Sequence, residues 1–206
     1  MKDRTDRTVS ARRVSGFFPV LFCRVSLFLF FCFLSLWSQA EEITAVSGKY
    51  SQSIQRISLR YGINPRFVQA LIWRESRFAA DATGTHGEIG LMQVRMDVVQ
   101  DWAKQHRRTV PSRDQIYEVE QNLSIGIWHL DRALKNWEGY PDQAKLALLE
   151  YNRGRSALLR ALAHHDGDVA AMLNMYRDHT YPDDILAKFL EYSRTGEEIS
   201  EFASLP

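Results

Sequence analysis

The stretch NPRFVQALIWRE, residues 64–75, decides how this chain folds. Asparagine followed by proline is a strong helix start, because asparagine caps free backbone N–H groups and proline is tolerated at the first helical position. Apolar side chains then recur at the three-to-four spacing of one helical face, at Phe67, Val68, Leu71 and Ile72. Glu75 falls on the same face. The sequence therefore predicts an acid at the end of a helix, facing the core.

A carboxyl group in that position favours one kind of chemistry. Burial disfavours the charged form and raises a carboxyl pKa, and a carboxyl that is protonated near neutral pH is a general acid. A loop with three glycines follows over residues 81–94, which leaves room for a substrate beside the acid. We therefore predict a raised pKa for Glu75 and interpret it as the proton donor in cleavage of a glycosidic bond.

The first forty residues have the pattern of a secretory signal peptide. Arg4, Arg7, Arg12 and Arg13 precede an apolar core over residues 25–37, and the segment ends in SQA, residues 38–40, a small-x-small cleavage site. We expect cleavage after Ala40 and export to the periplasm. The alternative is an uncleaved membrane anchor over residues 17–37, although a proline and an arginine interrupt that longer run.

Composition excludes several classes of function for the rest of the chain. Both cysteines, Cys23 and Cys32, lie in the leader, so residues 41–206 can form no disulfide, thiolate nucleophile or cysteine-based metal site. Removing the six basic and two acidic residues of the leader from totals of 26 and 25 leaves 20 and 23, a formal net charge of −3. That balance gives no electrostatic footprint for nucleic acid.

The remainder of the chain reads as helix after helix, so we expect an all-α fold. One domain is predicted over residues 41–196, followed by a tail over 197–206. Residues 81–94 lack a helical period and are predicted as a loop or a short β-hairpin, and residues 110–118 as a connecting segment. The longest helix is predicted over 120–137, with others over 51–60, 94–105, 141–149, 156–163, 169–176 and 183–192.

Three short motifs resemble those of the family 1, or Slt-type, lytic transglycosylases of the lysozyme-like superfamily. Glu75-Ser76 matches the motif that holds the catalytic acid, residues 90–93 (GLMQ) match the second motif, and Tyr151-Asn152 matches the end of the third. Each motif is weak alone, but the ordered set is specific, and the resemblance covers about residues 54–192. It implies a helical domain like that of goose-type lysozyme and Slt, with one elongated cleft.

The resemblance implies an activity on peptidoglycan glycan strands. Glu75 would protonate the glycosidic oxygen between N-acetylmuramic acid and N-acetylglucosamine. As a carboxylate it would then take the proton of the muramic C6 hydroxyl, which attacks C1 and closes a 1,6-anhydro ring. No water is consumed, and no metal or organic cofactor is implied.

The first two motifs would supply the residues around the acid. Ser76 would orient Glu75, or bond the backbone as a helix-terminal serine. Gly90 would let the sugar chain approach the backbone closely. Met92 and Gln93 would line the cleft, with core packing as the alternative for Met92.

Later tyrosines and an asparagine complete the implied site. Tyr151 and Asn152 would lie at a helix end beside Glu75 and bond either that carboxyl or the N-acetyl group of the substrate. Tyr181 resembles the late tyrosine of the family, and Tyr176 is a competing candidate.

Two departures from the family pattern bear on the product. The family often has a serine nine residues after the acid and an alanine thirteen residues after it; here those positions hold Gly84 and Glu88. Thr83 or Thr85 would have to supply the missing hydroxyl. A second carboxylate can hold a water for inverting hydrolysis, so a muramidase that uses Glu88 is one alternative. The other interpretation is that Glu88 only bridges loop backbone or a nearby arginine.

Further expectations concern the surface and the partners. Glu150 stands where the family has alanine, and we expect it to be exposed beside Tyr151. Trp73, near the end of the catalytic helix, is the best aromatic candidate for a sugar contact. A glycan-binding envelope protein without catalysis is the alternative from another class, and the intact Glu75 argues against it. We expect a monomer; a partner in an envelope or secretion apparatus stays open, because no motif supports one.

Overall fold

The computed structural model describes residues 48–177 and 180–203, with side chains up to Arg194. All of these residues belong to one structural unit, residues 43–206. The predicted signal peptide or anchor over residues 1–40 lies outside the described part. Among the residues described, no helix has the length and apolar character needed to cross a membrane.

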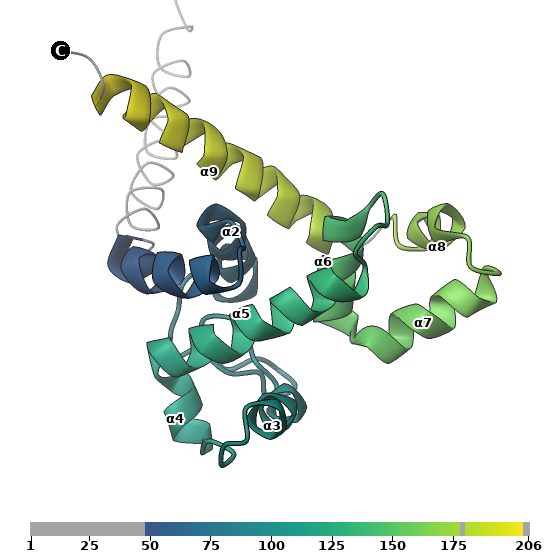
Figure 1. Cartoon of the computed structure of the whole chain (residues 1–206), viewed down its shortest axis with the longest axis horizontal. Helices are drawn as coiled ribbons and strands as arrows, with labels where there is room; N and C mark the ends of the chain where they lie inside the picture. Colours follow the sequence, from purple (N-terminus) through teal and green to yellow (C-terminus); the bar gives the residue numbers. More distant parts are fainter. Residues whose placement is uncertain (1–47, 178–179, 204–206) are drawn as a thin grey trace, which may run out of the picture. The chain divides into compact units, whose positions relative to one another are not determined.

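Helices build the described part of the chain, as Figure 1 shows, and the all-α fold class is confirmed. Residues 81–94 form the expected loop, in which Ile89 makes isolated antiparallel bridges to Thr83 and Val94. A first helix covers residues 48–60. The others are α2 (Pro65–Ser76), α3 (Met96–Gln105), α4 (Arg113–Tyr117), α5 (Val119–Asn136), α6 (Gln143–Arg153), α7 (Arg155–His164), α8 (Val169–Met175) and α9 (Tyr181–Ala203).

The predicted elements differ from the observed ones in three places. Residues 110–118 contain the short helix α4, which begins with a capping box between Ser112 and Gln115; five residues are too few to show a helical period, so only the local Ser-x-x-Gln pattern indicates it. The longest described helix is α9, with 23 residues against 18 in α5. It also continues to Ala203, past residue 192 where we expected the helix to end; a glycine within a helix weakens it by only about 1 kcal/mol.

The two ends of α2 explain how Glu75 is placed. At the start, the side chain of Asn64 accepts a hydrogen bond from the Arg66 N–H, at 2.9 Å, as the Asn-Pro pair predicts. Just after the end, Arg77 and Phe78 both have left-handed backbone conformations, with φ of 52° and 63°. Two such residues in succession without glycine are unfavourable, and they turn the chain sharply away from the helix.

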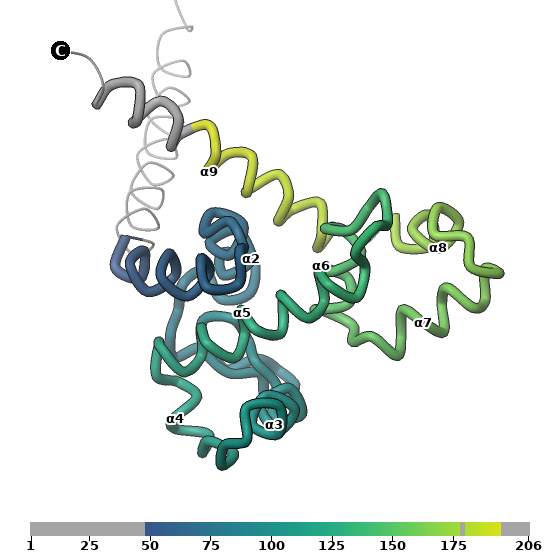
Figure 2. Tube along the Cα trace, in the orientation of Figure 1, coloured from purple at the N-terminus to yellow at the C-terminus, as the bar shows by residue number. Residues whose placement is uncertain are grey.

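Two clusters of buried apolar side chains hold the helices together. The larger joins the helix 48–60, α2, α3, α5 and the start of α9, and includes Ile54, Leu71, Leu91, Leu123 and Ile185. The smaller joins the end of α5 to α6, α7 and α8, through Trp137, Leu146, Leu158 and Met172. Figure 2 shows α7 and α8 on the far side of α6 from α2 and α3.

Packing between helices brings three helix ends together. The helix α5 packs on α3, α4 and α6, while α2 packs along α9, where Phe67 and Phe189 meet edge-on at 5.6 Å. The start of α9 also packs on α6. The ends of α2 and α6 thus meet the beginning of α9.

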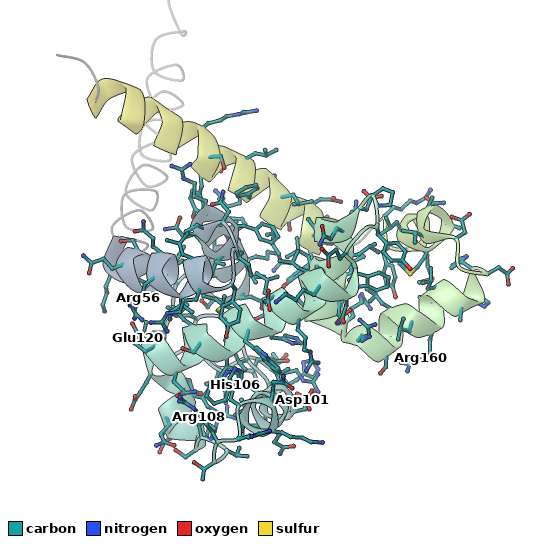
Figure 3. All side chains as sticks on the ribbon, viewed as in Figure 1. Arg56, Asp101, His106, Arg108, Glu120 and Arg160 are labelled. Carbon is teal, nitrogen blue, oxygen red and sulfur yellow. The ribbon has the colours of Figure 1, made fainter. Side chains whose placement is uncertain are left out.

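On another side of the domain, Arg56 of the first helix forms an ion pair with Glu120 of α5, and the two point toward each other in Figure 3.

Candidate active site

A cleft of about 360 Å³ opens where these three helix ends meet. Glu75 lies in it, at the end of α2, and is half-buried. The residues that line the cleft come from the end of α2, from α6 and from the start of α9: Arg74, Glu75, Leu149, Asn152, Arg153, Thr180 and Tyr181. Most of this lining is polar or charged, which suits a hydrated ligand such as a saccharide.

Burial raises the pKa of Glu75 from its ordinary 4.5 to about 7. The Tyr181 hydroxyl donates a hydrogen bond to Oε1 of Glu75, and this bond lowers the pKa, as does the charge of Arg74. The charge of Glu88 raises it slightly further. The acid therefore exchanges its proton near neutral pH, in agreement with the raised pKa that its helical register predicts.

Of the two late tyrosines, Tyr181 is the one at the acid. It is buried, and burial together with the charge of Glu75 holds its own pKa well above the ordinary value, so it remains a hydrogen-bond donor. Tyr176 instead belongs to the smaller apolar cluster, where the guanidinium of Arg153 lies over its ring at 5.3 Å.

Tyr151 and Asn152 have separate positions. The Tyr151 hydroxyl donates to the carbonyl oxygen of Met92, at 2.8 Å, and so ties α6 to the 81–94 loop. Its ring packs against the ring of His129, with centroids 4.9 Å apart. The side chain of Asn152 is exposed in the cleft beside Glu75, where a ligand can reach its amide.

Ser76 and Gln93 hold the loop in place. Ser76 Oγ donates to the carbonyl oxygen of Leu91 at 2.8 Å, which fastens the end of α2 to the loop. Gln93 has a left-handed backbone, and its Nε2 donates to the carbonyl oxygens of Gly90 at 2.8 Å and Ala82 at 3.3 Å. Both bonds from Gln93 stay within the loop, so the side chain braces it from inside.

Met92 fills the core, in line with the alternative we raised for it. The side chain is fully buried, and it packs so closely on Gly126 of α5 that a Cβ there would lie 2.5 Å from the Met92 sulfur. The side chain cannot touch a sugar in this position. Its backbone carbonyl, which accepts the Tyr151 hydrogen bond, is the part of Met92 that helps to shape the site.

Asn122 is a structural residue of the site that the sequence analysis missed. It is completely buried on α5; its Oδ1 accepts from the Met92 N–H at 2.9 Å, and its Nδ2 donates to the carbonyl oxygens of Ile89 and Ile116 at 2.8 and 3.1 Å. A Cβ on Gly90, whose φ is +72°, would lie 2.5 Å from that Nδ2. Gly90 is therefore required by Asn122. The available signal was an asparagine in register with the buried face of α5, which also holds Gly126 and Leu130.

Gly84 and Glu88, the two departures from the family pattern, lie against each other. A Cβ on Gly84 would lie 2.2 Å from Oε2 of Glu88 and 2.7 Å from Oε1 of Gln93, so Glu88 occupies the space that a side chain at 84 would need. Glu88 Oε2 accepts a hydrogen bond from the His86 N–H at 2.9 Å. This is the bridge to loop backbone that we gave as one interpretation of Glu88.

Glu88 is ionised at neutral pH. Burial alone raises its pKa, but the N–H groups of Glu88 and His86 and the charges of His86 and Arg95 outweigh that effect and hold the pKa below its ordinary value.

Thr83 and Thr85 do not replace the missing serine at Glu75. Thr83 bonds the Tyr117 hydroxyl and Thr85 the His86 ring, at 2.5 and 3.2 Å.

Glu150 is buried, which contradicts our expectation that it is exposed. Only 1% of its surface is accessible, and its carboxylate accepts hydrogen bonds from Asn136 Nδ2 at 2.7 Å and Trp137 Nε1 at 2.8 Å. The guanidinium of Arg155 lies 3.5 Å away. The donors come from the end of α5 and the start of α7. The packing of these helices on α6 brings the donors to Glu150 and so offsets the cost of burying its charge.

Two cations lie over the ring of Trp73, the aromatic residue for which we predicted a sugar contact. The guanidinium of Arg77 lies over its ring at 3.5 Å and the ammonium of Lys188 at 4.5 Å. These cations stabilise the junction of α2 and α9 and cover the aromatic surface that a sugar would need.

In the ranges 48–177 and 180–203, no three His, Cys, Asp or Glu side chains cluster closely enough to hold a metal ion.

Comparison with known proteins gives one family. The model of the transglycosylase SLT domain matches residues 52–170. The chain is 24% identical over 132 residues to membrane-bound lytic murein transglycosylase C of Edwardsiella ictaluri, covering 61% of this chain and 37% of that protein. It is 26% identical over 159 residues to the protein of the same name from Haemophilus influenzae, covering 72% and 44%. The chain thus spans less than half the length of these relatives.

A solved structure shows a similar fold. It is that of an inactive mutant of the lytic transglycosylase Slt from Pseudomonas aeruginosa, which matches with a TM-score of 0.61 and 20% sequence identity. The match covers 71% of this chain and 24% of that one. At this level of identity the likeness concerns the fold.

Proposed function

Because the chain belongs to the transglycosylase SLT domain family, we propose that it is a lytic transglycosylase of peptidoglycan. It cleaves the β-1,4 bond between N-acetylmuramic acid and N-acetylglucosamine and leaves a 1,6-anhydro-N-acetylmuramic acid end. The observation that carries this proposal is Glu75, a half-buried carboxyl with a pKa of about 7 in a polar cleft, bonded by Tyr181. Relatives named lytic murein transglycosylase C support the substrate class.

One group with such a pKa can serve both steps of the reaction. Protonated Glu75 gives its proton to the glycosidic oxygen as the bond to C1 breaks. The carboxylate that remains is stabilised by the hydrogen bond from Tyr181. It then takes the proton of the C6 hydroxyl as that oxygen bonds to C1, so Glu75 ends protonated and no water enters.

Of the other motif residues, one is placed to contact the substrate directly, and the others hold the loop in position. Asn152 is exposed in the cleft and is the candidate to bond the N-acetyl group. Ser76, Gln93 and Tyr151 bond backbone carbonyls of the loop or of Met92, so they position the loop beside Glu75. Gly90 serves this purpose too, since it leaves room for Asn122.

The two alternatives are less well supported. A muramidase needs a second carboxylate that holds water opposite the acid, but Glu88 is bonded to the His86 N–H and is absent from the residues that line the cleft. A binding protein without catalysis has no need of a half-buried acid with a raised pKa. The family match favours neither alternative.

The location follows from the same relatives. Their names call them membrane-bound, so we place this chain in the cell envelope, with peptidoglycan glycan strands as its ligand. Residues 1–40 would direct export to the periplasm or anchor the protein there. We further propose that it acts as a monomer.

Mass spectrometry of the products tests the proposal. Purified peptidoglycan sacculi are digested with the protein, with Glu75→Gln, and with Glu138→Gln, which makes the same change at an exposed site. We expect 1,6-anhydro muropeptides from the parent and from Glu138→Gln, and none from Glu75→Gln. Products heavier by one water would make the protein a hydrolase, and the same products from Glu75→Gln would remove the acid from the mechanism.

A further inference from the structure

The first turn of α9 carries an acid that holds the neighbour of Glu75. We propose that Asp184 is a positioning residue of the proposed reaction, on which this inference rests, and that it keeps the guanidinium of Arg74 beside Glu75. Arg74 directly precedes Glu75 on the last turn of α2, and both line the cleft. Asp184 is not among the residues that line it. Its effect on the acid therefore passes through Arg74.

Contacts with the start of α9 fix the position of Arg74. Its Nε lies 3.3 Å from Oδ2 of Asp184. The same oxygen accepts a hydrogen bond from Thr180 Oγ1 at 3.0 Å, so the carboxylate is itself held in place. The guanidinium also lies over the ring of Tyr181, at 5.3 Å. Because the hydroxyl of that ring bonds Glu75, a guanidinium that is kept over Tyr181 stays near the acid.

The position of Arg74 matters because its charge favours the carboxylate form of Glu75. Burial raises the pKa of Glu75, and the hydrogen bond from Tyr181 and then the charge of Arg74 lower it. An opposite charge has this effect at short range, within about 6 Å. The Arg74 side chain is 36% exposed, so without an anchor it can turn into water, which screens its charge. We therefore expect loss of the anchor to raise the pKa of Glu75.

Each element packed around Glu75 and Arg74 contributes charged or titratable groups: Arg77 from α2, Glu88 from the loop, Tyr151 and Arg153 from α6, and Tyr181 and Asp184 from α9. Asp184 contacts Arg74 and also acts on Arg77, whose guanidinium is stacked on Trp73 at 3.5 Å. Its neighbour Asp183 instead pairs with Lys145 of α6, at 2.9 Å. The two adjacent acids of α9 therefore hold different cations, and of the two it is Asp184 that holds the one next to Glu75.

A purely structural role for Asp184 predicts a different result. Acids in the first turn of a helix stabilise it, and Asp183 and Asp184 both lie there. The ion pair between Arg74 and Asp184 is partly exposed, at 36% and 41% of the two side chains, so it adds little to stability. Such a role can change the free energy of unfolding, but it leaves the pKa of Glu75 unchanged.

Carbon-13 NMR titration of the Glu75 carboxyl measures its pKa without substrate, and the loss of one signal in Glu75→Gln assigns it. The decisive pair of variants is Asp184→Ala and Asp184→Asn. Both remove the same charge, but the asparagine oxygen can still accept a hydrogen bond from Nε of Arg74. We expect the pKa of Glu75 to be higher in Asp184→Ala than in Asp184→Asn by roughly 0.5–1 pH unit, part of the effect of one nearby opposite charge.

Two controls test whether the difference is carried by Arg74. In the Arg74→Gln background, alanine and asparagine at position 184 should give Glu75 the same pKa. Asp183→Ala and Asp183→Asn make the same comparison at the adjacent acid, which pairs with Lys145, and should agree with each other. The alkaline limb of kcat/KM on soluble glycan strands should follow the NMR values in each variant, because the acid must be protonated to act.

Three results would overturn the inference. One is a pKa of Glu75 in Asp184→Ala that is no higher than in Asp184→Asn. Another is a difference that persists in the Arg74→Gln background, which would assign the effect to a displaced Tyr181. The third is an equal difference at position 183. Failure of the proposed function looks different, because the parent would then form no 1,6-anhydro product whatever the titration gives, and Asp184 would have no reaction to serve.

Discussion

At the scale of single residues, the proton affinity of Glu75 is set by opposing effects. Burial raises its pKa, while the hydrogen bond from Tyr181 and the charge of Arg74 lower it to about 7. A group that must first give a proton and then take one back works best with such a balance. The hydroxyl of Tyr181 therefore has a role that its ring cannot replace.

Removing that hydroxyl should shift the pH dependence of the enzyme. In Tyr181→Phe the carboxylate of Glu75 loses its donor, so its pKa should rise above about 7. The alkaline limb of kcat/KM, measured on soluble glycan strands, should then move to higher pH, and the maximal rate should fall because the carboxylate is less stable. An alkaline limb at the parent's position would show that Tyr181 does not set the acidity of Glu75.

Glu75 should also make stability depend on pH. Its pKa is about 7 in the folded protein against an ordinary 4.5, so between these values the unfolded chain releases a proton that the folded chain keeps. The free energy of unfolding should fall as pH rises through this window, by up to about 3 kcal/mol. Glu75→Gln should match the parent at pH 4 and be more stable at pH 8 in thermal unfolding. Parallel curves would contradict the raised pKa.

The contact between Gly84 and Glu88 predicts a coupled pair of substitutions. Gly84→Ser alone forces a side chain into the space of the Glu88 carboxylate, and overpacking of this kind costs about 1–3 kcal/mol. Adding Glu88→Ala should recover part of that loss, because it removes the carboxylate, while Gln93 Oε1 at 2.7 Å and the Cβ of residue 88 at 3.0 Å remain. A double-mutant cycle of unfolding free energies measures the coupling. Additive effects would mean that the loop relaxes and the two positions are independent.

At the scale of elements, the 81–94 loop depends on α5. The buried amide of Asn122 bonds the backbone on both sides of Gly90, through Ile89 and Met92. Ser76 fastens the same loop to α2, and Tyr151 fastens it to α6. Three helices thus hold one irregular segment next to the end of α2, without a regular hairpin.

Asn122→Ala should damage both stability and activity. The substitution leaves buried N–H and C=O groups without partners, so we expect a loss of about 2–4 kcal/mol in chemical unfolding. The rate per folded molecule should fall as well, because the loop beside Glu75 loosens. Asn174→Ala, at an exposed site on α8, is the matched control and should stay within about 0.5 kcal/mol of the parent. Equal unfolding energies for the two variants would refute the role of Asn122.

The sequence predicts helices from periodic patterns better than it predicts the polar contacts between them. The Asn-Pro start and the register of Glu75 are local, so both can be predicted for α2. Asn122 and Glu150 depend on partners in other elements, and such partners cannot be deduced from spacing along one helix. The contact of Trp73 with Lys188 is likewise made between α2 and α9, over a separation that no local pattern reports.

At the scale of the whole described unit, the two apolar clusters support different parts of the structure. The larger one supports the cleft and the loop, and the smaller one holds α7 and α8 against α6. In the candidate site, the motifs predicted which residues gather near Glu75, but several of them act through the backbone. Whether a motif residue faces the cleft or the core depends on the packing of all the helices.

Hydrogen exchange should reveal this division. Fewer buried side chains hold α7 and α8, so their amides should exchange earlier than those in the centre of α5, which lies between both clusters. Mass spectrometry of peptides from the folded protein at neutral pH measures both. Equal protection of α8 and central α5 would show that the unit opens only as a whole.

The close approach of Glu88 to Gly84 also restricts the history of this chain. A serine at 84 and a glutamate at 88 would compete for the same space, since a Cβ at 84 would lie 2.2 Å from Oε2 of Glu88. A chain that carried the serine and alanine of the family pattern would have two routes to the present pair. The route that introduced the acid first passes through the clash, whereas the route that first lost the serine side chain avoids it. Selection for a stable fold therefore favours one order of events, glycine before glutamate.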